Sequence, residues 1–156
     1  MKLERYWFAE EPRGELYHSL IEIGRQSASR MILVLHPKLD LSDHAQAVLE
    51  QLQPWLESSE IGTEWPGTML LGGETARVDE YALTAESSAV IAEAAEHLYA
   101  WVQPELPEDL SLLRDNGRPW LVTIAHEHES FLSLTAEEYI ALGEQSPGLV
   151  RMLVPE

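Results

Sequence analysis

The sequence contains no cysteine. This absence excludes disulfide bonds, thiolate metal ligands and a cysteine nucleophile. It is also typical of proteins in a reducing compartment. We therefore expect a cytoplasmic protein whose fold is held by its core alone.

Long apolar runs are also missing. No segment reaches the roughly 18 apolar residues that a membrane span requires. The first fifteen residues lack the apolar stretch of a secretory signal. We expect no membrane insertion and no secretion.

Positive charge is scarce, because 10 basic residues face 27 acidic ones and the formal net charge is −17. Such a field repels nucleic-acid phosphates and anionic membranes, and it attracts basic proteins. The acidic excess could equally serve solubility alone. Nucleic-acid binding is thus not expected, whereas a basic protein partner fits the charge.

The length of 156 residues suits one domain, residues 1–156, with a core of ordinary size. Helical and strand patterns are interspersed, and two hairpins imply antiparallel pairing. We therefore predict an α+β fold: a mixed or antiparallel sheet packed by about three to four helices. The predicted strands are 3–9, 30–36, 68–71, 75–83, 120–125, 131–134 and 149–154, and the predicted helices are 15–26, 43–53, 85–102 and 136–142. Ser42 and Thr84 are the expected caps of the second and third helices.

Two segments in the middle of the chain receive more specific predictions. Residues 57–66 are polar and contain glycine and proline, so we expect a long loop. Residues 67–83 should form a hairpin around Gly72 and Gly73.

Residues 109–142 hold the clearest folding instructions. Asp115, Asn116 and Gly117 predict a tight turn, and the polar run 126–130 predicts a second reversal. The result is a three-stranded meander, followed by a helix that starts with a capping box at 135–138. Trp120 alternates with two apolar residues, as on a buried strand face: they are Val122 and Ile124.

The histidine pair His126 and His128 is the candidate metal site. In an extended chain both imidazoles would lie on one face and could share an ion. The alternative is a solvated turn, and the zinc-protease spacing is not met because Ser130 stands where a histidine is required. Further ligands would come from elsewhere in the chain, and the candidates are His36, His44 and remote carboxylates.

Signatures of nucleophilic or nucleotide chemistry are missing. There is no G-x-S-x-G motif, and the Gly72-Gly73 pair is not followed by the Gly-Lys-Ser/Thr of a phosphate loop. We therefore predict no catalytic residue and no cofactor.

Trp65 lies in a segment that contains proline and glycine and has acidic neighbours. An exposed tryptophan of this kind is typical of a protein interface, together with Glu64, Glu127 and Glu129. Alternatively, Trp65 folds back onto the edge of the sheet.

Several short motifs between residues 65 and 138, covering about the second half of the chain, form a pattern. The pattern resembles that of small, uncharacterised acidic bacterial proteins, and it is loosely similar to the immunity-type proteins of bacterial toxin systems. The resemblance implies a binding role and carries no catalytic residue. The motifs are 65–68 (WPGT), 107–110 (PEDL), 116–117 (NG), 120–121 (WL), 125–127 (AHE) and 134–138 (LTAEE).

The leading hypothesis is a non-enzymatic, acidic protein-interaction domain, of the immunity-inhibitor kind, that binds a basic partner. The alternative is a small metal-binding or metal-assisted hydrolase domain that uses His126 and His128. A third hypothesis is a homo-oligomer that pairs through an edge strand.

Overall fold

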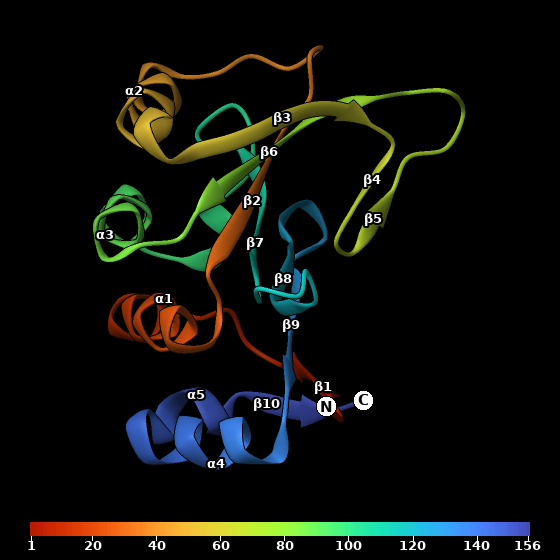
Figure 1. Ribbon diagram of the computed structural model, residues 1–156. Coiled ribbons are helices and arrows are strands. Elements are labelled where there is room, and N and C mark those ends of the chain that lie inside the picture. The colour runs from red at the N-terminus through yellow and green to blue at the C-terminus, as the bar shows by residue number, and fades with distance from the viewer.

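A computed structural model describes residues 1–156 and shows an α+β fold (Figure 1). Eight strands form one antiparallel sheet in the order β10-β1-β9-β8-β7-β2-β6-β3, and β4 pairs only with β5. The predicted fold class is confirmed, with five α-helices. No helix is long and apolar enough to cross a membrane.

The elements follow one another without long gaps. The strands are β1 (Glu4–Phe8), β2 (Arg30–Leu35), β3 (Leu56–Gly62), β4 (Glu64–Trp65), β5 (Thr68–Met69), β6 (Ala76–Ala82), β7 (Glu108–Leu113), β8 (Pro119–Ile124), β9 (Glu129–Leu134) and β10 (Leu153–Pro155). The helices are α1 (Glu15–Ser27), α2 (Asp43–Leu52), α3 (Ala85–Ala94), α4 (Ala136–Gln145) and α5 (Pro147–Arg151), with 3-10 turns η1 (Gln53–Trp55), η2 (Leu98–Ala100) and η3 (Ala125–Glu127).

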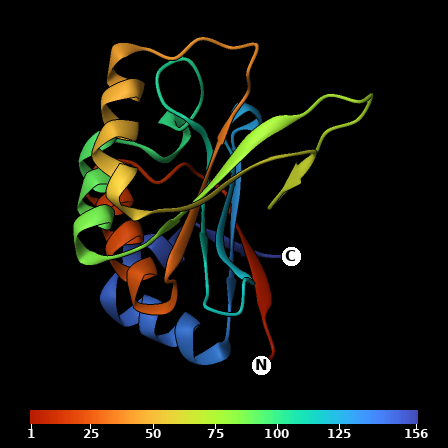
Figure 2. The same cartoon turned by 45° about the horizontal axis from the view of Figure 1, so that its top comes forward.

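The two faces of the sheet differ in what covers them. All the helices lie on one side, whereas the β4–β5 hairpin lies over the other (Figures 1 and 2). The main core, of 26 buried residues, fills the helix-covered face. Helix α1 approaches the sheet at Gly24, where a Cβ atom would meet the side chains of Leu112 at 2.7 Å and Trp120 at 2.8 Å. We call the other side the open face.

The sequence signals for helix starts and for the meander are confirmed. Ser42 caps α2, Thr84 caps α3, and Thr135 forms a capping box with Glu138. Strands β7, β8 and β9 pair in order, and Gly117 takes a φ of 83° in the first turn.

The predicted loop at 57–66 and hairpin at 67–83 are wrong. Most of the first segment is β3, an edge strand whose polar side chains reach water on both faces. Strand β5 pairs with β4, and β6 pairs with β2 and β3, so the chain around Gly72 and Gly73 joins two different sheets. The polar composition of residues 57–66 correctly predicted that most of them are exposed, but it did not predict that the backbone is extended as a strand.

The third helix is shorter than predicted, because it ends at Ala94 and not at residue 102. Beyond it, His97 forms a β-bridge with Arg13, and the indole N–H of Trp101 donates to the Tyr17 hydroxyl at 3.0 Å. Most of the apolar residues after Ala94 are thus buried as expected, but in an irregular segment that contains the 3-10 turn η2. The predicted last strand is also shorter, because its first half forms α5.

Strand β8 does not keep one buried face. Trp120 is buried in the main core as expected, but Val122 and Ile124 belong to a separate apolar cluster. The pairing of β8 with β7 shifts register near Leu113 and Pro119. This irregularity explains why Trp120 faces the helix-covered side of the sheet, whereas Val122 and Ile124 face the open side.

Candidate metal centre

The candidate site lies where three neighbouring strands meet one end of the sheet. Strand β2 ends just before His36, β7 begins with Glu108 and Asp109, and β8 leads into His126. Because adjacent strands run antiparallel, the end of β2, the start of β7 and the end of β8 lie together. Residues distant in sequence therefore share one site.

Three of these side chains are close enough to share an ion. Glu108, Asp109 and His126 each offer a ligand atom, and these atoms all lie within 4.8 Å of one another. The Nε2 atom of His36 lies 3.0 Å from Oε2 of Glu108. The site therefore combines two imidazoles with two carboxylates.

Asp109 has the most unusual surroundings. It is fully buried, and its φ of 55° lies in the left-handed region. Its Oδ2 accepts the Trp65 indole N–H at 2.9 Å, and its Oδ1 accepts the Ala125 amide at 3.0 Å. Burial raises the pKa of Asp109, although these hydrogen bonds and the nearby His126 and His36 oppose the rise. No lysine or arginine pairs with this carboxylate.

Hydrogen bonds with the Gln103 side chain hold the loop after β2 beside the site. The Gln103 side-chain carbonyl accepts the His36 amide at 2.7 Å, and its amide group donates to the His36 carbonyl at 3.4 Å. The same group also reaches the carbonyls of Leu39 and Asp40 at 3.3 and 3.4 Å. His36 is thus positioned by a buried side chain.

The β4–β5 hairpin forms a wall of the site. Trp65 packs with Ile32 and Val34 on the open face of the sheet. The turn fits closely because Gly67 has a φ of 84°, and a Cβ atom there would lie 2.7 Å from Val122. The Thr68 hydroxyl oxygen is buried without a hydrogen-bond partner.

A pocket of about 960 Å³ opens from these groups to solvent. Its lining includes His36, Glu108, His126, Trp65 and Thr68. An ion held by Glu108 and His126 would therefore be accessible to a small ligand or to water.

Only one of the two predicted metal-ligating histidines belongs to this group. The chain turns at η3 and His128 takes a left-handed φ of 56°, so the two imidazoles do not share a strand face. The His128 ring instead packs on Tyr99, with ring centroids 5.4 Å apart. The prediction of a His126–His128 pair is wrong for His128, because the reversal is a 3-10 turn.

Trp65 is not an exposed interface anchor. It is only 6% exposed, so its predicted burial is confirmed, but it packs over central strands and not over the edge of the sheet. Glu64, Glu127 and Glu129 are exposed as expected, and Glu127 lines the pocket. The predicted binding set therefore loses its aromatic member.

Sequence reasoning did not identify Glu108 and Asp109 as site residues. The available signal was their position directly before the apolar run at 110–113, where a buried strand begins. Of the remote histidines considered, His36 reaches the site, whereas His44 lies 2.8 Å from the Ala94 carbonyl.

Comparison with known proteins supplies no relative. No family model, curated protein or solved structure matches this chain. Functional assignment therefore rests on the chemistry of the site. Imidazole and carboxylate ligands suit zinc, manganese, iron and nickel ions, and N–H donors behind a ligating carboxylate orient it.

Proposed function

We propose that this protein binds one divalent transition-metal ion through Glu108, Asp109 and His126. His36 orients Glu108 by a hydrogen bond from outside the ligand set. The observation that carries the proposal is Asp109, a buried carboxylate without a cationic partner on a left-handed backbone. Both features cost free energy, and such costs concentrate at functional sites.

Three protein ligands leave coordination positions open toward the pocket. Catalytic metal sites keep such a position for water, which the ion makes acidic enough to act as a nucleophile near neutral pH. Metal-assisted hydrolysis is accordingly the reaction class that we propose for the site. Glu127, which lines the same pocket, lies beside the region that a substrate would enter.

Binding is tested by calorimetric titration of metal-free protein with zinc, manganese and nickel. We expect one ion per chain and at least a roughly tenfold loss of affinity in Asp109→Asn and His126→Ala. The matched control is His128→Ala, which removes an imidazole two residues away. Equal losses in both histidine variants would contradict the proposed ligand set.

Hydrolysis is tested with an activated ester and an activated phosphodiester, with and without the bound ion. We expect turnover that requires the ion, disappears in His126→Ala and persists in His128→Ala. Stoichiometric binding without turnover of either compound would leave a binding role and exclude this reaction for these substrates.

A second proposed function, binding of a basic protein, is supported by three exposed apolar side chains, of which Met69 also lines the pocket of the metal site. Ile61, Met69 and Leu71 are 70%, 63% and 80% exposed, close in sequence to Glu60 and Glu64. Exposed apolar side chains among carboxylates are typical of a protein interface. The net charge of −17 would steer a basic partner to it, as in an immunity-type inhibitor.

This interaction is tested by capture of basic proteins on immobilised protein at low and high salt. We expect capture that weakens steeply with salt, since electrostatic steering is screened. Leu71→Ser should reduce it, and Ile140→Ser, at a site 61% exposed on α4, should not. Capture that ignores both salt and Leu71→Ser would contradict this function.

A further inference from the structure

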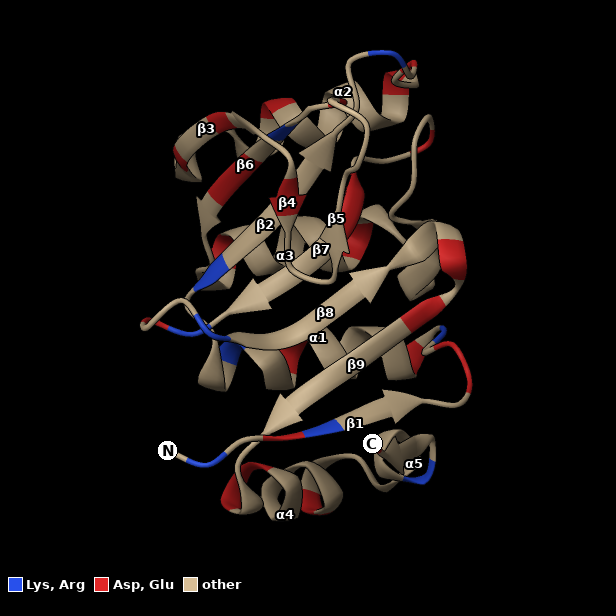
Figure 3. Ribbon diagram, turned by 90° about the vertical axis from the view of Figure 1, so that its right-hand side faces the viewer, with Lys and Arg blue, Asp and Glu red and all other residues tan.

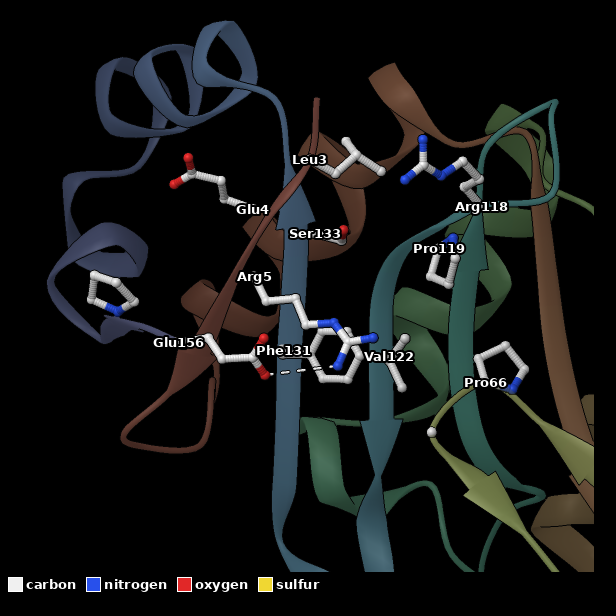
Figure 4. Close-up of a pocket in the computed structure, with 12 residues that line it drawn as sticks. Leu3, Glu4, Arg5, Pro66, Arg118, Pro119, Val122, Phe131, Ser133 and Glu156 are labelled. Carbon is white, nitrogen blue, oxygen red and sulfur yellow. Dashed lines mark ion pairs between the residues drawn. The ribbon is translucent and has the colours of Figure 1, made fainter. Parts of the chain in front are cut away.

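A second pocket lies on the open face, on the other side of the hairpin turn from the metal centre. It encloses about 690 Å³ beside β1, β8 and β9 (Figure 4). Pro66 and Gly67 of the turn form one wall. Leu3 and Pro66 supply partly exposed apolar surface, whereas Val122 and Phe131 are only 1% and 6% exposed. None of the proposed metal ligands lines it.

Two guanidinium groups line this pocket from different elements. Arg5, on β1, lies over the Phe131 ring at 4.6 Å from its centroid. Arg118, beside the start of β8, is exposed and forms no ion pair, and its Nη1 donates only to the Met1 carbonyl at 3.4 Å. Lysine and arginine are few in this chain, and Figure 3 shows how sparsely they are spread among the carboxylates.

The surroundings of Arg5 show the kind of group that it can bind. The Glu156 carboxylate lies 3.7 Å from the Arg5 guanidinium and also accepts the Trp7 indole N–H at 3.1 Å. The other acidic lining residue, Glu4, pairs with Lys2 at 3.8 Å. The Glu156 carboxylate would thus compete with a ligand for Arg5, whereas the Arg118 guanidinium forms no ion pair.

We propose that this pocket binds a small organic anion that carries one carboxylate or phosphate group on a flat apolar body. The guanidinium groups of Arg5 and Arg118, which line the pocket, attract and bind the anionic group, since guanidinium forks match carboxylate and phosphate. The apolar body lies against Leu3 and Pro66, the partly exposed apolar residues of the lining. The proposal is independent of the metal centre and adds a second ligand site to the protein.

The probes are benzoate and phenyl phosphate, with benzyl alcohol as a neutral analogue and inorganic phosphate as an anion without an apolar body. We expect saturable binding of benzoate or phenyl phosphate, detected by nuclear magnetic resonance shifts, and at least tenfold weaker binding of the other two. The stronger of the two organic anions identifies the anionic group. Equal binding of benzyl alcohol and benzoate would overturn the proposal.

Charge variants give the sharper test because their effects have opposite signs. Arg118→Gln and Arg5→Gln should each weaken binding of the better probe about tenfold, as expected for a lost charge-assisted hydrogen bond. Glu156→Gln should tighten binding, because it removes the competing carboxylate. Arg151→Gln changes a surface arginine outside the pocket and should leave the binding of the anion unchanged. Binding of a metal ion at the metal centre should also leave it unchanged.

Weakening in Glu156→Gln would overturn the proposal, and so would unchanged binding in both pocket arginine variants. All these side chains lie at the surface, so correct folding of each variant is checked by its unfolding midpoint. The metal affinity of Arg118→Gln should equal that of the unsubstituted protein. A loss of both activities would mean that the variant disturbs the hairpin rather than the pocket.

Discussion

Two aspartates are buried in this protein, and their surroundings differ. Asp79, on β6, accepts two hydrogen bonds from Arg77 at 3.0 and 3.1 Å and one from the Ser59 hydroxyl at 2.6 Å. Asp109, on β7, accepts only neutral N–H groups, from Trp65 and Ala125. One buried charge is neutralised by a neighbouring cation, and the other is not.

We interpret the difference as that between a structural carboxylate and a proposed metal ligand. A buried charge is tolerated when a partner and hydrogen bonds compensate its desolvation, and Arg77 provides this for Asp79. At Asp109 burial raises the pKa, and the hydrogen bonds from Trp65 and Ala125 offset only part of this rise. A bound metal ion would supply the missing positive charge.

The largest expected effect follows from neutralising each aspartate without changing its shape. Asp79→Asn should lower the free energy of unfolding by about 3 kcal/mol, because a buried carboxylate loses the charge-assisted hydrogen bonds from the half-exposed Arg77. Asp109→Asn, without metal, should cost below about 1 kcal/mol, because removal of an unpaired buried charge offsets one lost acceptor. Asparagine also tolerates the left-handed backbone at this position.

Urea unfolding of both variants at neutral pH measures this difference. The control is Asp40→Asn, which alters an exposed carboxylate and should change stability little. If Asp109→Asn cost as much as Asp79→Asn, Asp109 would be a structural charge as well, and the contrast would disappear.

Metal linkage gives the next largest effect. An ion that binds only the folded state stabilises it by about 2.7 kcal/mol at 100 times its dissociation constant. We expect this gain in the unsubstituted protein and its loss in Asp109→Asn. The control variant is Gln145→Ala, far from the site on α4, which should gain fully. A chelator should reverse the gain, and equal gains in Asp109→Asn would exclude Asp109 as a ligand.

The parts of the fold that were predictable are those encoded by neighbouring residues. Caps at Ser42 and Thr135 and the turn at Gly117 each depend on a few consecutive side chains, and all three are where the sequence places them. Strand β3 was missed because an edge strand need not be apolar, and its pairing with β6 is a tertiary contact.

The candidate site was predictable only in part, for a similar reason. His126 stood out because it is one of two closely spaced histidines, but its partners are brought together by strand order. Glu108 and Asp109 looked like any acidic pair before a strand, and only the pairing of β7 with β2 and β8 shows their burial. The left-handed backbone at Asp109 has no sequence signal, because aspartate is not a residue that requires it.

A smaller effect is expected when the hydrogen bond behind Asp109 is removed. Trp65→Phe keeps an aromatic ring against Ile32 and Val34 but deletes the N–H donor to Oδ2. We expect a loss of about 1.5 kcal/mol in unfolding free energy, because a buried carboxylate loses a donor. Metal affinity should fall by about tenfold or more, since this donor orients the ligand.

Trp101→Phe is the matched control, because it also deletes a buried indole hydrogen bond, here to Tyr17 in the helix-covered core. It should lower stability and leave metal affinity unchanged. Equal metal affinity in the two tryptophan variants would show that the indole of Trp65 only fills space.

The smallest effect concerns a third carboxylate, Glu138, which resembles Asp79 in having an arginine partner. Burial alone would raise the pKa of Glu138. Hydrogen bonds from Thr135 and Ser27 and the charge of Arg114 lower it by more, so the net shift of the pKa is downward. This is opposite to Asp109. A carboxylate with a lowered pKa stabilises the folded state above its unfolded value, near 4.5, and this contribution is lost as pH falls through the folded pKa.

Glu138→Gln should therefore cost about 1 kcal/mol at neutral pH, because glutamine keeps a neutral acceptor for the buried Arg114 and only the charge is lost. Glutamine can still accept the Thr135 amide, so the helix cap is retained. The difference from the unsubstituted protein should shrink to zero as the pH is lowered through the acid range below 4.5, measured by urea unfolding at each pH. Glu137→Gln, an exposed neighbour in the same helix turn, should show a smaller difference. A Glu138→Gln deficit that persists unchanged in acid would mean that shape, and not charge, makes this position stabilising, and the contrast with Asp109 would then rest on Asp79 alone.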